Sequence, residues 1–198
     1  MTLVEAAAQL VAGGLRTDRL LLRLPEPALA PALSAYYQRN AEHFAPYCPR
    51  RPPGFHAVDS WRERALVQRQ ASLAGYGLHL LLFRARGPAD EILGDVNFTN
   101  IIRGAFQAAY LGYELDHAHV GQGLMAEALR ASIAHVFQQL NLHRLMANHV
   151  PSNERSGRLL RRLGFSVEGY ARDYLLIDGV WKDHVLTSLL NPDFRTEE

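Results

Sequence analysis

The sequence predicts a single mixed α/β domain in which helices flank a central sheet. Strand-like runs with short connections fill the middle of the chain, a long amphipathic helix follows residue 124, and two further strands come last. The 198 residues suffice for one sizeable core, and the composition does not change sharply anywhere. We expect one domain over residues 1–198, about seven strands, and a helical extension over residues 1–14.

The first half of the chain is predicted to form an antiparallel meander accompanied by two helices. The connections "RARGPAD" and "NIIRGAF" are short and contain glycine or proline, so the strands that they join should be antiparallel neighbours. Strands are expected at residues 17–24, 78–83, 91–99 and 107–115, and helices at 28–40 and 58–73.

The second half is predicted to form a strand, helix, strand, helix unit followed by a hairpin. Apolar residues from Met125 to Leu140 recur at spacings of three and four, which indicates a long amphipathic helix. A second helix in "SNERSGRLLRRLGF" should stop at Gly164, because glycine favours the left-handed conformation that ends helices. Further strands are expected at residues 143–150, 165–176 and 184–190.

Composition argues against several classes of protein. The net charge of +1 is unlike that of nonspecific nucleic-acid-binding domains, and no apolar run is long enough to cross a bilayer. We therefore expect neither DNA nor a membrane as a partner. The first residues lack a basic segment and include Glu5, which argues against a secretory signal. Together with a single cysteine, Cys48, these features predict a cytoplasmic protein.

The stretch "HVGQGLM", residues 119–125, joins a strand to the long helix. Because Gly121 and Gly123 lack Cβ atoms, an anion such as phosphate can approach the unpaired N–H groups at the helix start, where the helix dipole attracts it. A tight turn without any ligand would explain the glycines equally well. A dinucleotide fingerprint is a weaker match, because no Asp or Glu lies between Glu127 and Glu154.

Two separated segments resemble the GNAT acyltransferase superfamily. Residues Val120 to Met125 stand where that family carries its acetyl-CoA loop, Q/R-x-x-G-x-G/A, and "NERSGRLLRRLGFSVEGY" from Asn153 resembles its N-x-x-S/A…L-G-F-x-x-E-G segment. Val120 and Met125 depart from the family pattern, but backbone N–H donors survive such changes. The resemblance implies a GNAT fold whose mixed sheet splays between the fourth and fifth strands, with acetyl-CoA in the gap.

Longer segments, among them "NFTNIIRGAF", "GQGLMAEAL" and "EGYARDYLLIDG", resemble the ribosomal-protein-alanine N-acetyltransferases of that superfamily over about residues 15–194. This resemblance implies transfer of an acetyl group from acetyl-CoA to the N-terminal alanine amine of a ribosomal protein, by direct attack on the thioester. The ribosome or a pre-ribosome is then a further candidate partner. Two alternatives are an acetyltransferase of a small amine, such as an amino acid or an aminoglycoside, and a non-catalytic ribosome-assembly factor that binds acetyl-CoA or RNA.

The resemblance implies that acetyl-CoA pairs with the backbone of the fourth strand and with the glycine turn. The expected cofactor-binding residues are Tyr113, Leu115, Val120, Gly121, Gln122, Gly123, Leu124, Met125, Ala126, Asn153 and Ser156. Gly112, in the middle of that strand, is suited to a β-bulge that would free backbone groups for the cofactor. Its other interpretation is that it only admits a bulky neighbour.

Acyl transfer to an amine needs a proton acceptor for the amine and a donor for the departing thiolate. Many GNAT members use a tyrosine as the donor, but Leu160 occupies that position, so we expect Ser156 to serve instead. Glu114 and Asp173 are the candidate bases. Asn153 could equally be a helix N-cap beside a solvated Ser156, and either carboxylate could be an ordinary surface residue.

The loop and helix that follow the first predicted helix should cover the acceptor side of the site. The residues expected there are Tyr47, Arg50, Arg51, Phe55 and Trp61. A basic stripe of Arg155, Arg158 and Arg162 could hold the 3′-phosphate of CoA, touch ribosomal RNA, or be a solvated helix face. His117 and His119 have no further ligands nearby in the sequence, so we expect no metal.

Overall fold

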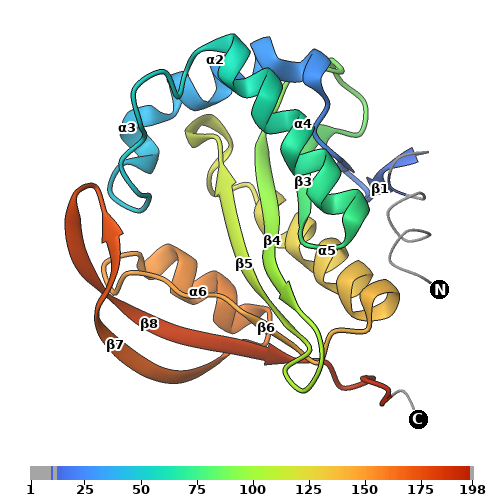
Figure 1. The fold of residues 1–198 in the computed structure, drawn as a ribbon, viewed down its shortest axis with the longest axis vertical. Coiled ribbons are helices and arrows are strands. Elements are labelled where there is room, and N and C mark those ends of the chain that lie inside the picture. Colours follow the sequence, from blue (N-terminus) through green and yellow to red (C-terminus); the bar gives the residue numbers. More distant parts are fainter. Residues whose placement is uncertain (1–9, 11–12, 197–198) are drawn as a thin grey trace.

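The computed structural model describes residues 10 and 13–196, and within them the chain forms one eight-stranded mixed sheet with helices on both faces (Figure 1). The strands are β1 (Leu15–Arg16), β2 (Leu20–Arg23), β3 (Leu78–Arg84), β4 (Gly94–Ile102), β5 (Ala108–Leu115), β6 (Arg144–Met146), β7 (Ser166–Ile177) and β8 (Val180–Leu190). The helices are α2 (Ala30–Arg39), α3 (Ala41–Phe44), α4 (Val58–Ala74), α5 (Leu124–Leu140) and α6 (Glu154–Arg162), with 3₁₀ turns η1 (Pro27–Leu29) and η2 (His117–His119).

The sheet runs in the order β1-β2-β3-β4-β5-β6-β8-β7, and each neighbouring pair is antiparallel except β5 and β6. The predicted mixed sheet flanked by helices is thus confirmed. The eighth strand is β1, which precedes the stretch predicted as the first strand. It pairs with β2 because the chain turns at Thr17, whose N–H donates to the Leu20 carbonyl at 2.9 Å. The helix predicted over residues 1–14 lies largely outside the described residues.

Alternation along the strands divides the apolar side chains between two cores. In β3, Leu80 and Leu82 pack with α5 and α6 on one face, whereas Leu81 and Phe83 pack with α2 and α4 on the other. The same alternation in β4 sends Val96 and Phe98 to the α5 side, leaving the intervening positions for the α4 side. Each sheet face therefore has its own chemistry, which matters for the site.

The sheet opens between β5 and β6. The two strands pair only from Ala108 with Arg144 to Tyr110 with Met146, and β5 then continues alone on that side (Figure 1). The predicted splay between the fourth and fifth major strands is confirmed. The bulge predicted at Gly112 is wrong, because this residue pairs regularly with Asn97, and the register shift of this ladder lies at the far end of β4.

Substitution of Phe98 tests how much the core on the α5 side of the sheet contributes to the free energy of unfolding. Its side chain is fully buried, so Phe98→Ala should lower the free energy of unfolding by about 3–5 kcal/mol through lost burial and a residual cavity. The control is Val67→Ala on α4, where 62% of the residue is exposed and a change within about 0.5 kcal/mol is expected. Urea denaturation measures both, and a similar small loss for the two variants would contradict this account of the core.

Candidate active site

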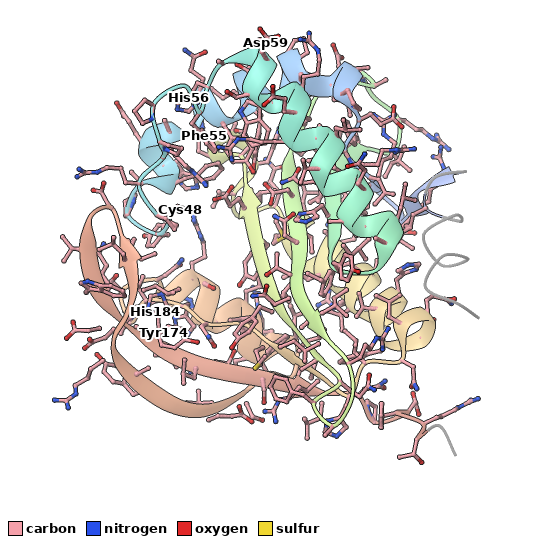
Figure 2. All side chains as sticks on the ribbon, in the orientation of Figure 1. Cys48, Phe55, His56, Asp59, Tyr174 and His184 are labelled. Carbon is pink, nitrogen blue, oxygen red and sulfur yellow. The ribbon has the colours of Figure 1, made fainter. Side chains whose placement is uncertain are left out.

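A cleft occupies the opening between β5 and β6. It has a volume of about 590 Å³ and is lined by side chains of β3 to β5, the segment before α4, the start of α5, and α6. The segment before α4 also meets the β7–β8 hairpin, since the Asp178 N–H donates to the Cys48 carbonyl at 3.2 Å. Figure 2 shows Cys48 and Phe55 on the segment before α4, and His184 on β8 across from them.

The glycine turn forms one end of the cleft. Gly121 and Gly123 have φ values of 82° and 75°, a left-handed conformation that favours glycine. Gly123 is the N-cap of α5, and the first amide to bond within the helix is that of Glu127, which donates to the Gly123 carbonyl at 3.1 Å. Among the described residues, the amides of 121–126 have no hydrogen-bond partner. They can therefore donate hydrogen bonds to an anion bound at the helix N-terminus.

Most of the residues predicted to bind the cofactor lie along the cleft. Those that line it are Tyr113, Leu115, Val120, Gly121, Gly123, Leu124, Met125, Ala126, Asn153 and Ser156. Gln122 does not line it, because its side chain turns back to donate to the Ala118 carbonyl at 3.2 Å, while its own carbonyl accepts from Arg19 at 3.0 Å. Arg19 also binds Glu127 on α5 at 2.6 Å, which braces the turn from outside.

Ser156 lies in the first turn of α6, on the α5 side of the opened sheet. Its amide donates to the Asn153 side chain at 3.1 Å, so Asn153 is indeed a helix N-cap. Its hydroxyl lies 2.7 Å from the Tyr113 hydroxyl of β5. Burial raises the pKa of Tyr113 to about 12, so this phenol remains a protonated donor. Leu160, at the position where the resemblance implies a tyrosine, is buried in the core and also lines the cleft.

Glu114 projects from β5 toward the opposite sheet face and lines the cleft there. It accepts hydrogen bonds from Arg51 and from the Cys48 thiol, both at 2.8 Å. Burial is the main cause that raises the pKa of Cys48, with Glu114 adding to it, so the thiol stays protonated and donates. Of the two predicted bases, Glu114 therefore faces the cleft on its α4 side.

Asp173, the other predicted base, is not brought to the cleft. It lies in β7 where the pairing with β8 shifts register, with an unusual φ of 46°, and its side chain is exposed. Its amide donates to Asp183 at 2.9 Å, away from the residues that line the cavity. The bulge breaks the simple alternation from which its direction was predicted.

The structure adds a second carboxylate that the sequence prediction missed. Asp95 of β4 pairs across the sheet with Glu114, is only 1% exposed, and lines the cleft. It accepts a hydrogen bond from the Tyr37 hydroxyl at 2.9 Å and another from the Asn97 amide. Burial, followed by the charge of Glu114, raises the pKa of Asp95 well above its usual range. In "GDVNFT", polar residues alternate with apolar ones, and this pattern was the signal that could have identified Asp95 as a residue facing the α4 side of the sheet.

Aromatic side chains cover the α4 side of the cleft, as expected. Tyr47, Arg51, Phe55 and Trp61 line it, whereas Arg50 lies outside and approaches Asp178 at 3.7 Å. Trp61 stacks on a further aromatic ring, Tyr37, with centroids 4.4 Å apart. The two arginines of the predicted basic stripe that reach the cleft are Arg155 and Arg162.

The chain matches the acetyltransferase (GNAT) domain family over residues 19–166. It is 44% identical over 180 residues to the ribosomal protein uS5-alanine N-acetyltransferase of Escherichia coli (strain K12), an alignment that covers 91% of this chain and 92% of that relative. The chain belongs to the GNAT acetyltransferase family. Its opened sheet and its glycine turn at the start of α5 are the parts of the GNAT fold that the sequence resemblance implied.

Two solved structures resemble this GNAT chain. The ribosomal-protein-S5-alanine acetyltransferase of Vibrio fischeri has a TM-score of 0.86 and 34% identity, covering 91% of this chain and 98% of that one. Mycobacterium smegmatis RimJ in complex with CoA-disulfide has a TM-score of 0.81 and 28% identity, covering 90% and 85%. The fold of this GNAT chain is thus shared along nearly its whole length.

Two features are absent from residues 10 and 13–196. In this part of the GNAT chain, no group of three or more His, Cys, Asp or Glu side chains is arranged to hold a metal ion. None of the helices described there has the length and hydrophobicity that a membrane span requires.

The raised pKa of Asp95 predicts a pH-dependent cost to stability. The folded chain keeps this proton to a higher pH than the unfolded chain does, so the free energy of unfolding falls as pH rises above about 4 toward the folded-state pKa. Asp95→Asn keeps the shape of the side chain and removes that loss, which has a slope of at most about 1.4 kcal/mol per pH unit. Urea denaturation at pH 5 and pH 7 should show the variant gaining stability relative to the wild type; an unchanged difference would contradict the assignment.

Proposed function

We propose that this enzyme transfers an acetyl group from acetyl-CoA to the N-terminal alanine amine of a ribosomal protein, the counterpart of uS5. The observation that carries the proposal is the arrangement of one cleft. At one end lie the unpartnered amides at the start of α5, and on the opposite sheet face lie Glu114 and the buried Asp95. The first feature suits an anionic cosubstrate and the second a cationic amine. The name of the Escherichia coli relative supports the choice of acceptor.

The residues around the glycine turn fit the cosubstrate. The unpartnered amides of residues 121–126 are suited to its diphosphate. Beyond Tyr110, β5 has no strand partner on its β6 side, so the backbone of residues such as Tyr113 and Leu115 can bond to amides laid along it. When bound there, acetyl-CoA supplies an acetyl group activated as a thioester.

The hydroxyls of Ser156 and Tyr113 suit the departing sulfur. They lie 2.7 Å apart at the start of α6, where the helix dipole also favours a developing negative charge. Ser156 then donates a hydrogen bond or proton to the thiolate, and Tyr113 holds the serine hydroxyl in position. The second hydroxyl compensates for Leu160 in the usual tyrosine position.

Glu114 is the proposed proton acceptor for the amine. An N-terminal amine has a pKa near 8 and is largely protonated at neutral pH, so it must lose a proton before it attacks the acetyl carbon. Glu114 lines the cleft, and Arg51 and Cys48 fix its carboxylate at 2.8 Å each. Asp95 pairs with Glu114 across the two strands, and the charge of Glu114 is one of the causes that raise the pKa of Asp95.

The proposed acceptor also suggests where the enzyme works. A ribosomal protein, either free or within a ribosome or pre-ribosome, would present its N-terminus to the cleft, and the enzyme would act in the cytoplasm. Arg155 and Arg162 of α6 lie along the cleft and could contact ribosomal RNA as well as the cosubstrate.

A direct assay tests the proposal. Purified protein incubated with acetyl-CoA and a synthetic peptide that carries the alanine N-terminus of uS5 should add one acetyl group to the α-amine, detected by mass spectrometry with fragmentation. The same peptide with a blocked N-terminus is the control and should remain unmodified. Acetylation only of a lysine side chain, or none at all, would contradict the proposed function.

Substitution of Ser156 tests the proton donor. Ser156→Ala should lower kcat by about a hundredfold while the Kd for CoA changes little, and Tyr113→Phe should lower kcat by a smaller factor. The matched control is Ser152→Ala, an exposed serine just before the same helix that makes no contact with Tyr113. Equal turnover in Ser156→Ala and Ser152→Ala would remove Ser156 from the mechanism.

Substitution of Glu114 tests the base. Glu114→Gln should have a much lower kcat/KM for the peptide, because a neutral amide cannot accept the proton of the amine. Steady-state kinetics at a fixed pH measure the loss. An unchanged kcat/KM in the variant would remove Glu114 from the mechanism.

A further inference from the structure

Gly112 is a glycine in the middle of a regular strand. It pairs with Asn97 inside an unbroken part of the β4–β5 ladder, and its φ is not in the left-handed region that favours glycine. A glycine at such a position weakens a strand, because it loses more conformational freedom on folding and packs no side chain. The backbone conformation therefore gives no reason for a glycine here.

Packing within the protein gives no reason either. A Cβ atom built on Gly112 would meet no heavy atom within 4 Å. Gly94 of β4 provides the contrast, because a Cβ atom there would lie 2.5 Å from the Glu114 carbonyl oxygen. Gly94 is thus required by its neighbours, whereas Gly112 leaves open space that no part of the described chain fills.

That open space belongs to the cleft, on one particular face of the sheet. Gly112 is exposed and lines the cavity. A side chain at this position would project to the same side as that of Glu114, two residues along, and to the side opposite Tyr113. The face with Tyr113 and Ser156 is the proposed cosubstrate side. The space above Gly112 therefore lies on the other face, beside Glu114 and Asp95.

We infer that Gly112 is the floor of the acceptor subsite, a conclusion that rests on the proposed function. The first residue of the acceptor peptide lies over Gly112, with its amine directed toward Glu114 and its backbone close to the strand. The missing side chain makes room for that backbone and for a small first side chain. Gly112 is accordingly a specificity-determining position that takes no part in the chemistry.

The test is a graded series, Gly112→Ala and Gly112→Val, assayed with the uS5 N-terminal peptide. Both variants should be at least as stable as the wild type, because each reduces the freedom of the unfolded chain and valine suits a strand. The Kd for CoA, measured by calorimetry, should stay within about twofold. In contrast, kcat/KM for the peptide should fall about tenfold for alanine and about a hundredfold for valine.

The matched controls are Gly169→Ala and Gly169→Val in β7. This residue is also a strand glycine whose built Cβ atom meets nothing within 4 Å, but it does not line the cleft. The control variants should retain wild-type kcat/KM.

Three outcomes would overturn the inference. Unchanged kcat/KM in Gly112→Val, with an active wild type, would show that nothing passes close to this position. A tenfold weaker Kd for CoA in that variant would assign the space to the cosubstrate. Failure of the wild type to acetylate the peptide at all would overturn the proposed function, and this acceptor subsite with it.

Discussion

The loss of pairing between β5 and β6 after Tyr110 is the constraint on which the rest of the site depends. Up to Tyr110 the two strands form an ordinary parallel ladder; beyond it, β5 keeps its pairing with β4 while the chain after Met146 leaves toward α6. Backbone groups along the opened edge have no strand partner. Because unpaired buried amides and carbonyls are costly, such an edge favours water or a ligand that can bond to it.

The opening also brings together two sheet faces that the strands otherwise separate. Residues of β5 alternate between them, so Tyr113 meets Ser156 on one side while Glu114 meets Arg51 on the other. One cavity can contact both faces only where β5 has no strand beside it on its β6 side. Proton donation to a leaving group and proton removal from an incoming amine are thereby assigned to opposite sides of one strand.

Local features of the site could be predicted from the sequence, and nonlocal ones could not. The glycine turn at Gly121 and Gly123, the N-cap Asn153 and the start of α5 depend on neighbouring residues, and the structure has them at the positions expected from the sequence. The hydroxyl contact between Tyr113 and Ser156 joins residues far apart in the chain, and no periodicity reports it.

The same distinction explains the predictions that failed. Asp95 is missed because its importance comes from the cross-strand pairing with Glu114 and from a hydroxyl on α2. Asp173 is excluded from the cleft by a register shift in β7, which simple alternation does not anticipate. Gly112 was predicted to form a bulge, which the regular ladder rules out.

The central claim is that the opened edge of β5 and the glycine turn together hold the cosubstrate. The most direct measurement is a titration of ¹⁵N-labelled protein with CoA, followed by the backbone amide chemical shifts. The account predicts that the largest changes fall on residues 121–126 and on the unpaired end of β5. Saturable binding that leaves those amides unchanged and shifts others would contradict it.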